Sequence, residues 1–355
     1  MTMQKSMSKA SNPLVTVVIP VFNGVKWLNT ALSSALNNSD VRLEVIVIDD
    51  GSTDGTTNFL LENYSDNANV ILLHNDSNKG IVATLNRGLD AARGRYIARL
   101  DADDICMPNR FSQQLLFLEE TGCHLCGSWF IEFGQGVPRT VRWPHEEDAV
   151  RAGMLFQSPI CHPTFFAKRE VFEHFSYRPE YKLAEDYDLL VRASSKFRLA
   201  NIPAALLKYR RHSGQETQSK QLQRVEVTRK IRSAALWSQG VEPDTKEEYF
   251  HHLIRAPLSI HDADELAGIE QWLLKLYKSQ HSDSARQIVA SQWIRACIRA
   301  APLRKSMWKL FFKSPLRKFA GQSKSTDIDI YLLSKLGLDY RSQTFKLLQR
   351  TGLSG

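Results

Sequence analysis

Two hydrophobic periods alternate along the first hundred residues. Four short apolar runs have the length and β-branched content of buried strands, at residues 14–20, 43–49, 69–74 and 95–100. Between them apolar residues recur at helical spacing, and the predicted helices lie near residues 27–36, 59–61 and 81–94. Gly94 suits the C-cap of the last of these. Strands that alternate with helices predict βαβ units, and therefore an α/β fold with a parallel sheet buried on both faces.

The pattern changes twice beyond residue 100. Pro108 suits the first turn of a further helix, whose apolar positions are Phe111, Leu115 and Leu118. To about residue 212 helices and strands are mixed, and from Gln215 onward the chain is helical and basic. We expect three parts: a disordered N-terminal tail at 1–12, a folded domain at 13–214 and a helical, basic C-terminal region at 215–355.

Composition is that of an ordinary globular protein, with one bias. Of the 355 residues 43% are hydrophobic and 24% charged, but the formal net charge is +8. That excess suggests an anionic partner: nucleic acid, an anionic membrane or a phosphorylated ligand. Residues 1–13 lack the apolar core of a secretory signal, and no run of 18 apolar residues occurs, so we expect a cytoplasmic protein without a transmembrane helix.

The cysteines do not predict a structural framework. There are five, an odd number in a long chain, which argues against a set of disulfides. Cys123 and Cys126 have CxxC spacing, but no second pair follows to complete a zinc site. Cys126 lies in an apolar stretch, so we expect it in the core.

Two acidic clusters follow predicted strands, DDGSTDG at 49–55 and DADD at 101–104. Ligands of such sheets bind beyond the carboxyl ends of the strands, so we expect the clusters to meet at one edge. In an extended loop Asp101 and Asp103 would point the same way, toward one cation, with Asp104 turned aside. Carboxylate oxygens favour Mg²⁺ or Mn²⁺, and such an ion binds a diphosphate. The alternative is an acidic loop that caps the next helix.

Two common phosphate-binding loops are missing from the sequence. No GxGxxG follows the first predicted strand, and no GxxxxGK[ST] occurs. Dinucleotide-binding and P-loop interpretations therefore lack their phosphate cradle. A diphosphate bound here would depend on the cation for much of its charge neutralisation.

Taken together, VVIPVFNG, VIVIDDGSTDGT, NKGIVATLNRGLDAARGRYIARLDADDICMPNR and LAEDYDLLVRAS resemble the successive motifs of family 2 glycosyltransferases. The resemblance covers about residues 13–212. It implies an inverting enzyme whose catalytic domain has the Rossmann-like nucleotide-diphospho-sugar transferase fold, with a mostly parallel central sheet. It further implies a nucleotide-diphospho-sugar donor, foremost a UDP-sugar, and Mn²⁺ or Mg²⁺ as cofactor.

The resemblance also implies roles for single residues. The nucleotide-binding set would comprise Pro20, Val21, Phe22 and Asn23 around the base and ribose, Asp50 as an acceptor from the base, and Lys79 in a loop beside the nucleotide. Asp103 would be the direct metal ligand, and Asp101 would contact the ribose or sugar while sharing the metal site. The residues themselves leave other roles open: Asp50 could cap the following helix, and Lys79 could be a solvated surface lysine.

Three acids, Glu185, Asp186 and Asp188, stand at a predicted helix start, where the helix dipole favours them. The resemblance implies that Asp186 is the catalytic base, with Glu185 as the second candidate. A sugar hydroxyl is a poor nucleophile until a base takes its proton as the new bond forms. One base and one stabilised leaving group are enough for a single displacement with inversion.

The segment KYRRHSGQ, 208–215, resembles the family's YRxH segment. His212 would complete the metal shell or contact the diphosphate, and Arg210 or Arg211 would pair with phosphate oxygens. An ordinary basic surface loop is an equally open interpretation. His162 either contacts the acceptor or is a buried, hydrogen-bonded histidine.

Residues 301–320 interleave six basic with eight apolar or aromatic side chains and contain no acid. This composition suits an anionic lipid surface, and Pro315 would divide the segment into two short helices. A helix packed on the protein is the alternative. No nucleic-acid-binding motif accompanies the charge, so we expect no nucleic acid partner.

The expected function is transfer of a single sugar to a hydroxyl of a glycan or lipid-linked acceptor in polysaccharide biosynthesis, such as lipopolysaccharide or capsule. The QxxRW motif of processive synthases is incomplete here: Gln221 and Arg224 are followed by Val225, not tryptophan. A sugar nucleotidyltransferase remains an alternative, although the first loop offers only Lys26 to hold a triphosphate. A non-catalytic nucleotide-sugar-binding module is the other.

Overall fold

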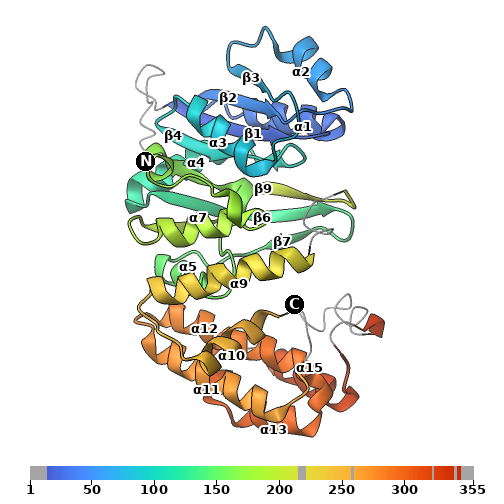
Figure 1. The fold of residues 1–355 in the computed structure, drawn as a ribbon, viewed down its shortest axis with the longest axis vertical. Coiled ribbons are helices and arrows are strands. Elements are labelled where there is room, and N and C mark those ends of the chain that lie inside the picture. The colour runs from blue at the N-terminus through green and yellow to red at the C-terminus, as the bar shows by residue number, and fades with distance from the viewer. Residues whose placement is uncertain (1–13, 215–220, 257–259, 322–323, 340–341, 345–355) are drawn as a thin grey trace, which may run out of the picture. The chain divides into compact units, whose positions relative to one another are not determined.

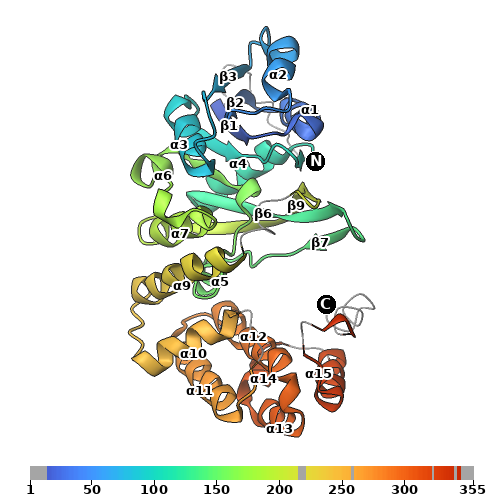
Figure 2. The same cartoon turned by 45° about the vertical axis from the view of Figure 1, so that its right-hand side comes forward.

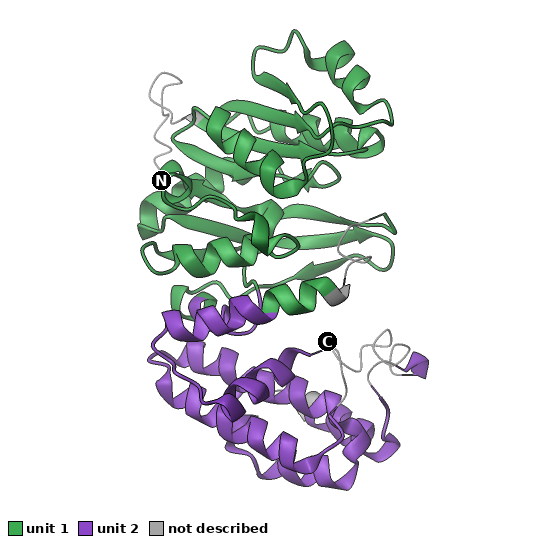
Figure 3. Ribbon diagram, in the orientation of Figure 1, with its two compact units in different colours: residues 1–150, 158–228 green, residues 151–157, 229–355 purple. Residues whose placement is uncertain are grey.

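The computed structural model describes residues 14–214, 221–256, 260–321, 324–339 and 342–344. The chain divides into two compact units, residues 1–150 with 158–228, and residues 151–157 with 229–355 (Figure 3). The predicted tail at 1–12 lies outside the described residues, and so does the start of the predicted C-terminal region at residue 215.

The first unit contains a nine-stranded sheet in the order β3-β2-β1-β4-β8-β6-β9-β5, with β7 paired to β6 (Figure 1). Its parallel half consists of β1 (Leu14–Val21), β2 (Arg42–Asp49), β3 (Val70–His74) and β4 (Tyr96–Arg99). The connecting helices are α1 (Val25–Leu36), α2 (Thr56–Tyr64) and α3 (Ile81–Ala91). The predicted βαβ alternation is confirmed, because these strands pair in parallel and a helix connects each to the next.

The other half of the sheet is mixed. It contains β5 (Ile105–Cys106), β6 (Leu125–Gly134), β7 (Arg139–Val141), β8 (Phe166–Lys168) and β9 (Leu199–Arg211). The helices here are α4 (Arg110–Thr121), α5 (Glu147–Gly153), α6 (Arg169–His174) and α7 (Glu185–Ala193), with short 3-10 turns η1 (His162–Thr164) and η2 (Pro179–Tyr181). β6 pairs parallel with β9 and antiparallel with β8. Cys126 is fully buried on β6, so its predicted core position is confirmed.

Two local predictions are wrong. α3 ends at Ala91 and the next residue is extended, so Gly94 is not its C-cap; the Gly94 N–H donates to Thr16 Oγ1 on β1 at 2.8 Å. α4 begins only at Arg110, because Asn109 is its N-cap in a left-handed conformation, with φ 59°. Pro108 therefore precedes the helix. At Gly94 a contact made far along the chain overrides the local signal.

Close packing fixes the strand ends that carry the site. A Cβ at Gly88 of α3 would lie 2.6 Å from Val18 Cγ1 and 2.8 Å from Ile48 Cδ1, so only glycine lets α3 approach β1 and β2 this closely. Arg110 is fully buried and its Nη2 donates to the Arg99 carbonyl at 2.9 Å. This hydrogen bond fixes the end of β4.

The described part of the second unit is helical (Figure 2), which confirms the predicted helical C-terminal extension. α9 (Gln221–Ser238) begins in the first unit, and the other helices are α10 (Thr245–Arg255), α11 (Ala263–Ser279), α12 (Asp283–Arg299), α13 (Lys305–Lys313), α14 (Pro315–Phe319) and α15 (Lys324–Leu336), with the 3-10 turn η3 (Ala301–Leu303). Pro315 opens α14, as predicted. None of the described helices is both long and apolar enough to cross a bilayer.

A buried histidine lies in the core of the second unit. His251 is fully buried, and its Nδ1 accepts a hydrogen bond from Trp272 Nε1 at 3.1 Å. Its other ring nitrogen, Nε2, therefore carries the proton and donates to the Leu155 carbonyl at 2.8 Å. Burial lowers the pKa of His251 to about 3. The imidazole is neutral in the folded protein.

Candidate active site

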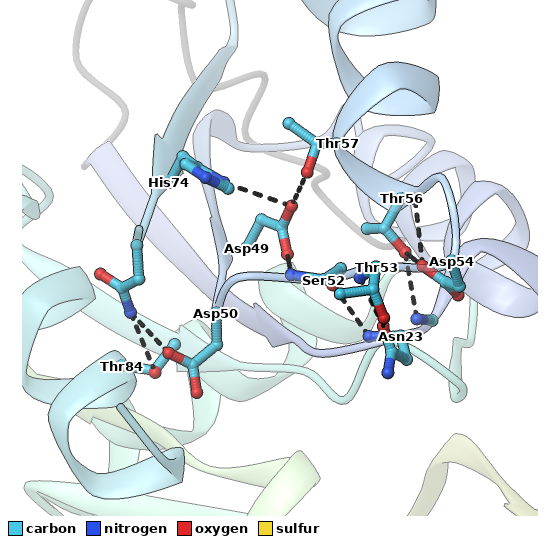
Figure 4. Close-up of polar contacts among 12 residues, drawn as sticks. Asn23, Asp49, Asp50, Ser52, Thr53, Asp54, Thr56, Thr57, His74 and Thr84 are labelled. Atoms are coloured by element: carbon cyan, nitrogen blue, oxygen red, sulfur yellow. Dashed lines mark hydrogen bonds and ion pairs between the residues drawn. The ribbon is translucent and has the colours of Figure 1, made fainter. Parts of the chain in front are cut away.

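The loops that follow β1 and β2 are tied together by Asn23 (Figure 4). Its backbone N–H donates to Ser52 Oγ at 2.8 Å, and its side-chain oxygen accepts from the Thr53 N–H at 2.8 Å. Asn23 has a positive φ of 51°, which asparagine tolerates better than most residues. Pro20 and Val21 are buried, whereas Phe22 is 49% exposed. Of this predicted nucleotide-binding segment, Phe22 and Asn23 are exposed.

The two acids after β2 have different partners (Figure 4). Asp49 accepts from the Ser52 N–H at 3.0 Å and from the Thr57 hydroxyl, so it holds its own turn. Asp50 is 4% exposed, and its carboxylate accepts from Asn75 Nδ2 at 2.7 Å. It also accepts from the backbone N–H groups of Lys79 at 2.8 Å and Gly80 at 2.9 Å. Asp50 thus fixes the loop before α3 and does not cap α2.

Lys79 takes part in this loop through its backbone, and its side chain is exposed. A carboxylate offers about four lone-pair positions, of which Asp50 uses three. One acceptor position therefore remains for a ligand. The loops after β1, β2 and β3 form one hydrogen-bonded unit at the carboxyl edge of the sheet, where the family resemblance predicts the nucleotide.

The second acidic cluster follows β4. Asp101, Asp103 and Asp104 bring one carboxylate oxygen each within 4.8 Å of one another. The prediction that Asp104 turns aside is wrong, because residues 101–104 form a turn, closed by the Asp104 N–H and the Asp101 carbonyl at 3.2 Å, instead of an extended loop. Burial, and then the charge of Asp101, raises the pKa of Asp103 and raises the pKa of Asp104 well above its usual range.

This cluster fits a hard divalent cation. Three carboxylates crowd together, and Asp104 Oδ2 is buried without a hydrogen-bond partner among the described residues. Desolvation and mutual repulsion disfavour the ionised carboxylates, and a divalent cation relieves both effects. Oxygen ligands of this kind suit Mg²⁺ or Mn²⁺. Asp101, Asp103 and Asp104 are the carboxylates of this cluster able to hold the ion.

β9 brings His212 and Arg210 to the same cluster. His212 Nε2 lies 2.8 Å from Asp103 Oδ2, and Arg210 Nε donates to the Asp103 carbonyl at 2.8 Å. The Arg210 guanidinium also lies 4.0 Å from the centre of the Trp27 ring, a neighbour that the sequence did not indicate. Arg211 instead forms an ion pair with Glu132, at 3.6 Å.

Two of the three acids at the start of α7 are available for chemistry. Asp188 is buried and pairs with Arg178 and Arg192, so it is structural. Asp186 is partly exposed, and its Oδ2 accepts from Ser158 Oγ at 3.2 Å. Burial raises the pKa of Asp186, and it raises the pKa of Glu185, helped by the charge of Asp186, to about 7. Glu185 is 8% exposed, with a buried Oε2 that lacks a partner among the described residues.

Arg99, at the end of β4, is a site residue that sequence reasoning missed. It is 6% exposed and forms an ion pair with Asp101. It also lies near enough to Glu185 and Asp186 to lower the pKa of each against the effect of burial. The available signal was a charged residue inside an apolar run, RYIARL, directly before the acidic cluster.

Of the two roles left open for His162, the structure shows the second, a buried and hydrogen-bonded histidine. Its Nε2 lies 2.8 Å from the Tyr177 hydroxyl, and its ring packs against Phe165 at 4.9 Å between centroids. Burial and the charge of Arg99 lower its pKa well below the usual value. A neutral, paired imidazole in this position supports the wall of the site.

Comparisons with known proteins match this chain to glycosyltransferases. The family model for glycosyl transferase family 2 matches residues 16–175. An uncharacterized glycosyltransferase of Haemophilus influenzae is 32% identical over 235 residues, which cover 62% of this chain and 72% of the relative. The putative glycosyltransferase EpsE of Bacillus subtilis is 33% identical over 218 residues, 57% of this chain and 75% of the relative.

A solved structure shares the fold. The crystal structure of S. aureus TarS 1–349 in complex with UDP-GlcNAc superposes with a TM-score of 0.55 at 19% identity. The superposition covers 91% of this chain and 90% of that one. The superposition includes both the predicted Rossmann-like domain and the predicted helical extension.

Proposed function

Because this chain belongs to glycosyltransferase family 2, we propose that it is an inverting, metal-dependent enzyme that transfers one sugar per encounter. The donor is a nucleotide-diphospho-sugar, foremost a UDP-sugar, and the acceptor is a hydroxyl of a glycan or lipid-linked glycan in surface polysaccharide biosynthesis. The observation that carries the proposal is the acidic cluster of residues 101–104. Arg99 links this cluster to α7, because it pairs with Asp101 and, against the effect of burial, its charge also lowers the pKa of Asp186.

The donor nucleotide is assigned to the hydrogen-bonded loops after β1, β2 and β3. Pro20, Val21, Phe22 and Asn23 would surround the base and ribose, with the exposed Phe22 ring as the contact surface. The remaining acceptor position of Asp50 would receive a base N–H, and the exposed Lys79 side chain would reach the nucleotide. The UDP-GlcNAc named in the TarS complex supports a nucleotide-sugar of this class.

The metal is assigned to Asp103 as direct ligand, with Asp101 and His212 completing the site on the protein side. The 2.8 Å contact between His212 and Asp103 supports this grouping. When bound, Mn²⁺ or Mg²⁺ supplies positive charge that stabilises the departing diphosphate. Arg210, held over Trp27 beside Asp103, adds a second cation on the same side.

Asp186 is assigned as the general base. Its partly exposed carboxylate would take the proton of the acceptor hydroxyl at the oxygen not bonded to Ser158. The hydroxyl oxygen then attacks the anomeric carbon as the bond to the diphosphate breaks, and one displacement inverts that carbon. Glu185, buried and with a pKa of about 7, is the second candidate for the same proton.

A screen of UDP release over nucleotide sugars, with and without divalent cation, tests the proposal. Asp103→Ala should abolish metal-dependent donor binding, whereas Asp186→Asn should keep donor binding and lose turnover by about 100-fold to 10,000-fold. Asp90→Asn, an exposed acid on α3, is the matched control. Unchanged UDP affinity with Mn²⁺ in the first variant, or wild-type turnover in the second, would contradict the assignment.

We assign a peripheral membrane position, on the cytoplasmic face, to the second unit. Lys305, Lys309, Phe312 and Lys313 are exposed on one face of α13. An exposed apolar face of α15 carries Ile328, Tyr331, Leu332 and Leu336. The Trp308 ring joins the two faces, 5.6 Å from the Phe312 ring and 5.1 Å from the Tyr331 ring. Cationic and apolar side chains side by side suit an anionic lipid surface.

Co-sedimentation with vesicles tests this position. The double change Lys309→Glu and Lys313→Glu should reduce binding to vesicles that contain phosphatidylglycerol by about tenfold or more, since each cation near the surface contributes about 1 kcal/mol. Lys278→Glu, an exposed lysine on α11, is the control. Equal binding of all three proteins would reject the membrane assignment.

A further inference from the structure

A pocket of about 260 Å³ lies in the first unit, next to the loop that leads into α7. It lies between the loop before that helix and the first turns of α9, and is lined by Glu180, Lys182, Leu183, Gln223 and Val227. Leu183 has a φ of 80°, a strained value for a leucine, two residues before Glu185. A strained backbone conformation persists only where the surrounding structure holds it, and such conformations are common at active sites and ligand sites.

Two exposed cations flank this pocket. Lys182 lines it, and Arg224 follows the lining residue Gln223 on α9. Burial raises the pKa of Asp186, and the charge of Arg224 is the strongest influence that lowers it again. No carboxylate within the described ranges forms an ion pair with Lys182 or Arg224. The acid of the pocket, Glu180, lies 4.0 Å from Arg178 Nε instead.

Lys182 also reaches the loop held by Asp50. Its Nζ lies 3.4 Å from the position that a Cβ at Gly80 would occupy. The ammonium group therefore stands between the predicted donor loop and the pocket. A molecule that fills the pocket would place an anionic group near Lys182, in the loop that leads directly to Glu185 and Asp186.

We propose that the acceptor of this enzyme carries an oxyanion, phosphate or carboxylate, that Lys182 and Arg224 bind in this pocket. The inference rests on the proposed function, because it places the acceptor beside the base of that reaction. Hydrogen bonds from a cation to an oxyanion are the strong ones, and arginine binds phosphate and carboxylate with two donors. A net charge of +8 would further attract an anionic acceptor to the protein.

Ligand-observed NMR titrations of the full chain, at pH 8 with and without UDP, provide the test. The probes are glucose, glucose 6-phosphate and glucuronate, which share a ring and differ in charge. The wild type should bind at least one charged sugar about tenfold or more tightly than glucose, the effect of one charge-assisted hydrogen bond. Comparison of the phosphate with the carboxylate identifies which oxyanion the pocket prefers.

Variants locate the effect. Lys182→Ala and Arg224→Ala should each reduce the preference for the charged sugar, and the double variant should abolish it. Lys230→Ala, an exposed lysine further along α9, is the matched control and should keep it. Equal affinity of the wild type for all three sugars, or a preference that survives in the double variant, would overturn the inference.

One further outcome separates the acceptor from the donor. If Lys182→Ala weakens UDP binding and leaves sugar binding unchanged, Lys182 belongs to the donor site and the inference is wrong. Failure of the wild type to bind UDP at all contradicts the proposed function instead. The two failures are thus distinguishable in one set of titrations.

Discussion

Replacement of Asp50 by asparagine tests whether this residue acts by holding the loop before α3 or by contacting the nucleotide. The carboxylate accepts three hydrogen bonds, two of them from the backbone N–H groups of Lys79 and Gly80. In Asp50→Asn one oxygen becomes an NH₂ group. If the remaining oxygen keeps Asn75 and Lys79, the new NH₂ group faces the Gly80 N–H, and a donor meets a donor.

The size of the effect follows from these contacts. The hydrogen bond from the Gly80 N–H is lost, and that donor is left without an acceptor next to residue 50, which is only 4% exposed. The bonds from Asn75 and Lys79 remain, but their acceptor is no longer charged. Hydrogen bonds to a charged acceptor contribute about 1.5–3 kcal/mol, and an unsatisfied buried donor costs about 1–3 kcal/mol. We expect the loop of residues 75–80 to be destabilised by about 2–4 kcal/mol.

Hydrogen exchange of peptides that cover residues 75–84 measures this change locally, which matters because a chain of two units does not unfold in one step. Protection of the loop should fall by about 30-fold to 1,000-fold, and UDP affinity should fall with it. Asp90→Asn is the control. If Asp50→Asn loses UDP binding while the loop keeps its protection, Asp50 acts on the nucleotide alone and the reasoning is refuted.

Acidification should destabilise the second unit through His251, whose pKa is lowered to about 3 by burial. The unfolded state binds the proton first, so between pH 7 and pH 5 about 2 kcal/mol is lost, and denaturation of His251→Gln should show a loss smaller by that amount. Arg224→Gln should move the acid limb of the kcat/KM profile to higher pH, because Arg224 lowers the pKa of Asp186 and the base must be ionised; an unmoved limb argues against Asp186. Gly88→Ala should destabilise the first unit by about 1–3 kcal/mol through overpacking, and an unchanged Tm would show that α3 can shift outward.

The parallel half of the sheet could be predicted because two independent signals coincide there. Strands buried on both faces are mainly apolar, and the helices between them show apolar residues at helical spacing. The end of each strand is therefore indicated both by the end of an apolar run and by the start of a helical period. The failures concern single backbone conformations. The turn at 101–104 accepts a hydrogen bond from far along the chain, from the Arg210 N–H to Asp104 Oδ1 at 2.8 Å, and no local pattern contains that partner.

The candidate site divides in the same way. Asp101, Asp103 and the α7 acids could be identified because they lie in motifs that resemble those of family 2 glycosyltransferases. Ser158 and Lys182 could not, because a serine or a lysine in a loop is ordinary until the fold brings it to Asp186 or to Gly80. Sequence reasoning thus identifies residues that lie in such motifs, and misses those made important by contact alone.

Arg99 explains how one edge of the sheet tolerates two acidic groups. Burial disfavours ionisation of Asp104, Glu185 and Asp186, and in each case the charge of Arg99 acts in the opposite direction. Its Nη2 is paired with Asp101, while Nε and Nη1 are buried without partners among the described residues. The guanidinium charge acts on all these neighbours, and its Nε and Nη1 groups remain able to donate to a further oxygen ligand. A metal ion at residues 101–104 would therefore share with Arg99 the task of neutralising this edge, and loss of the arginine would disturb the base as well as the metal site.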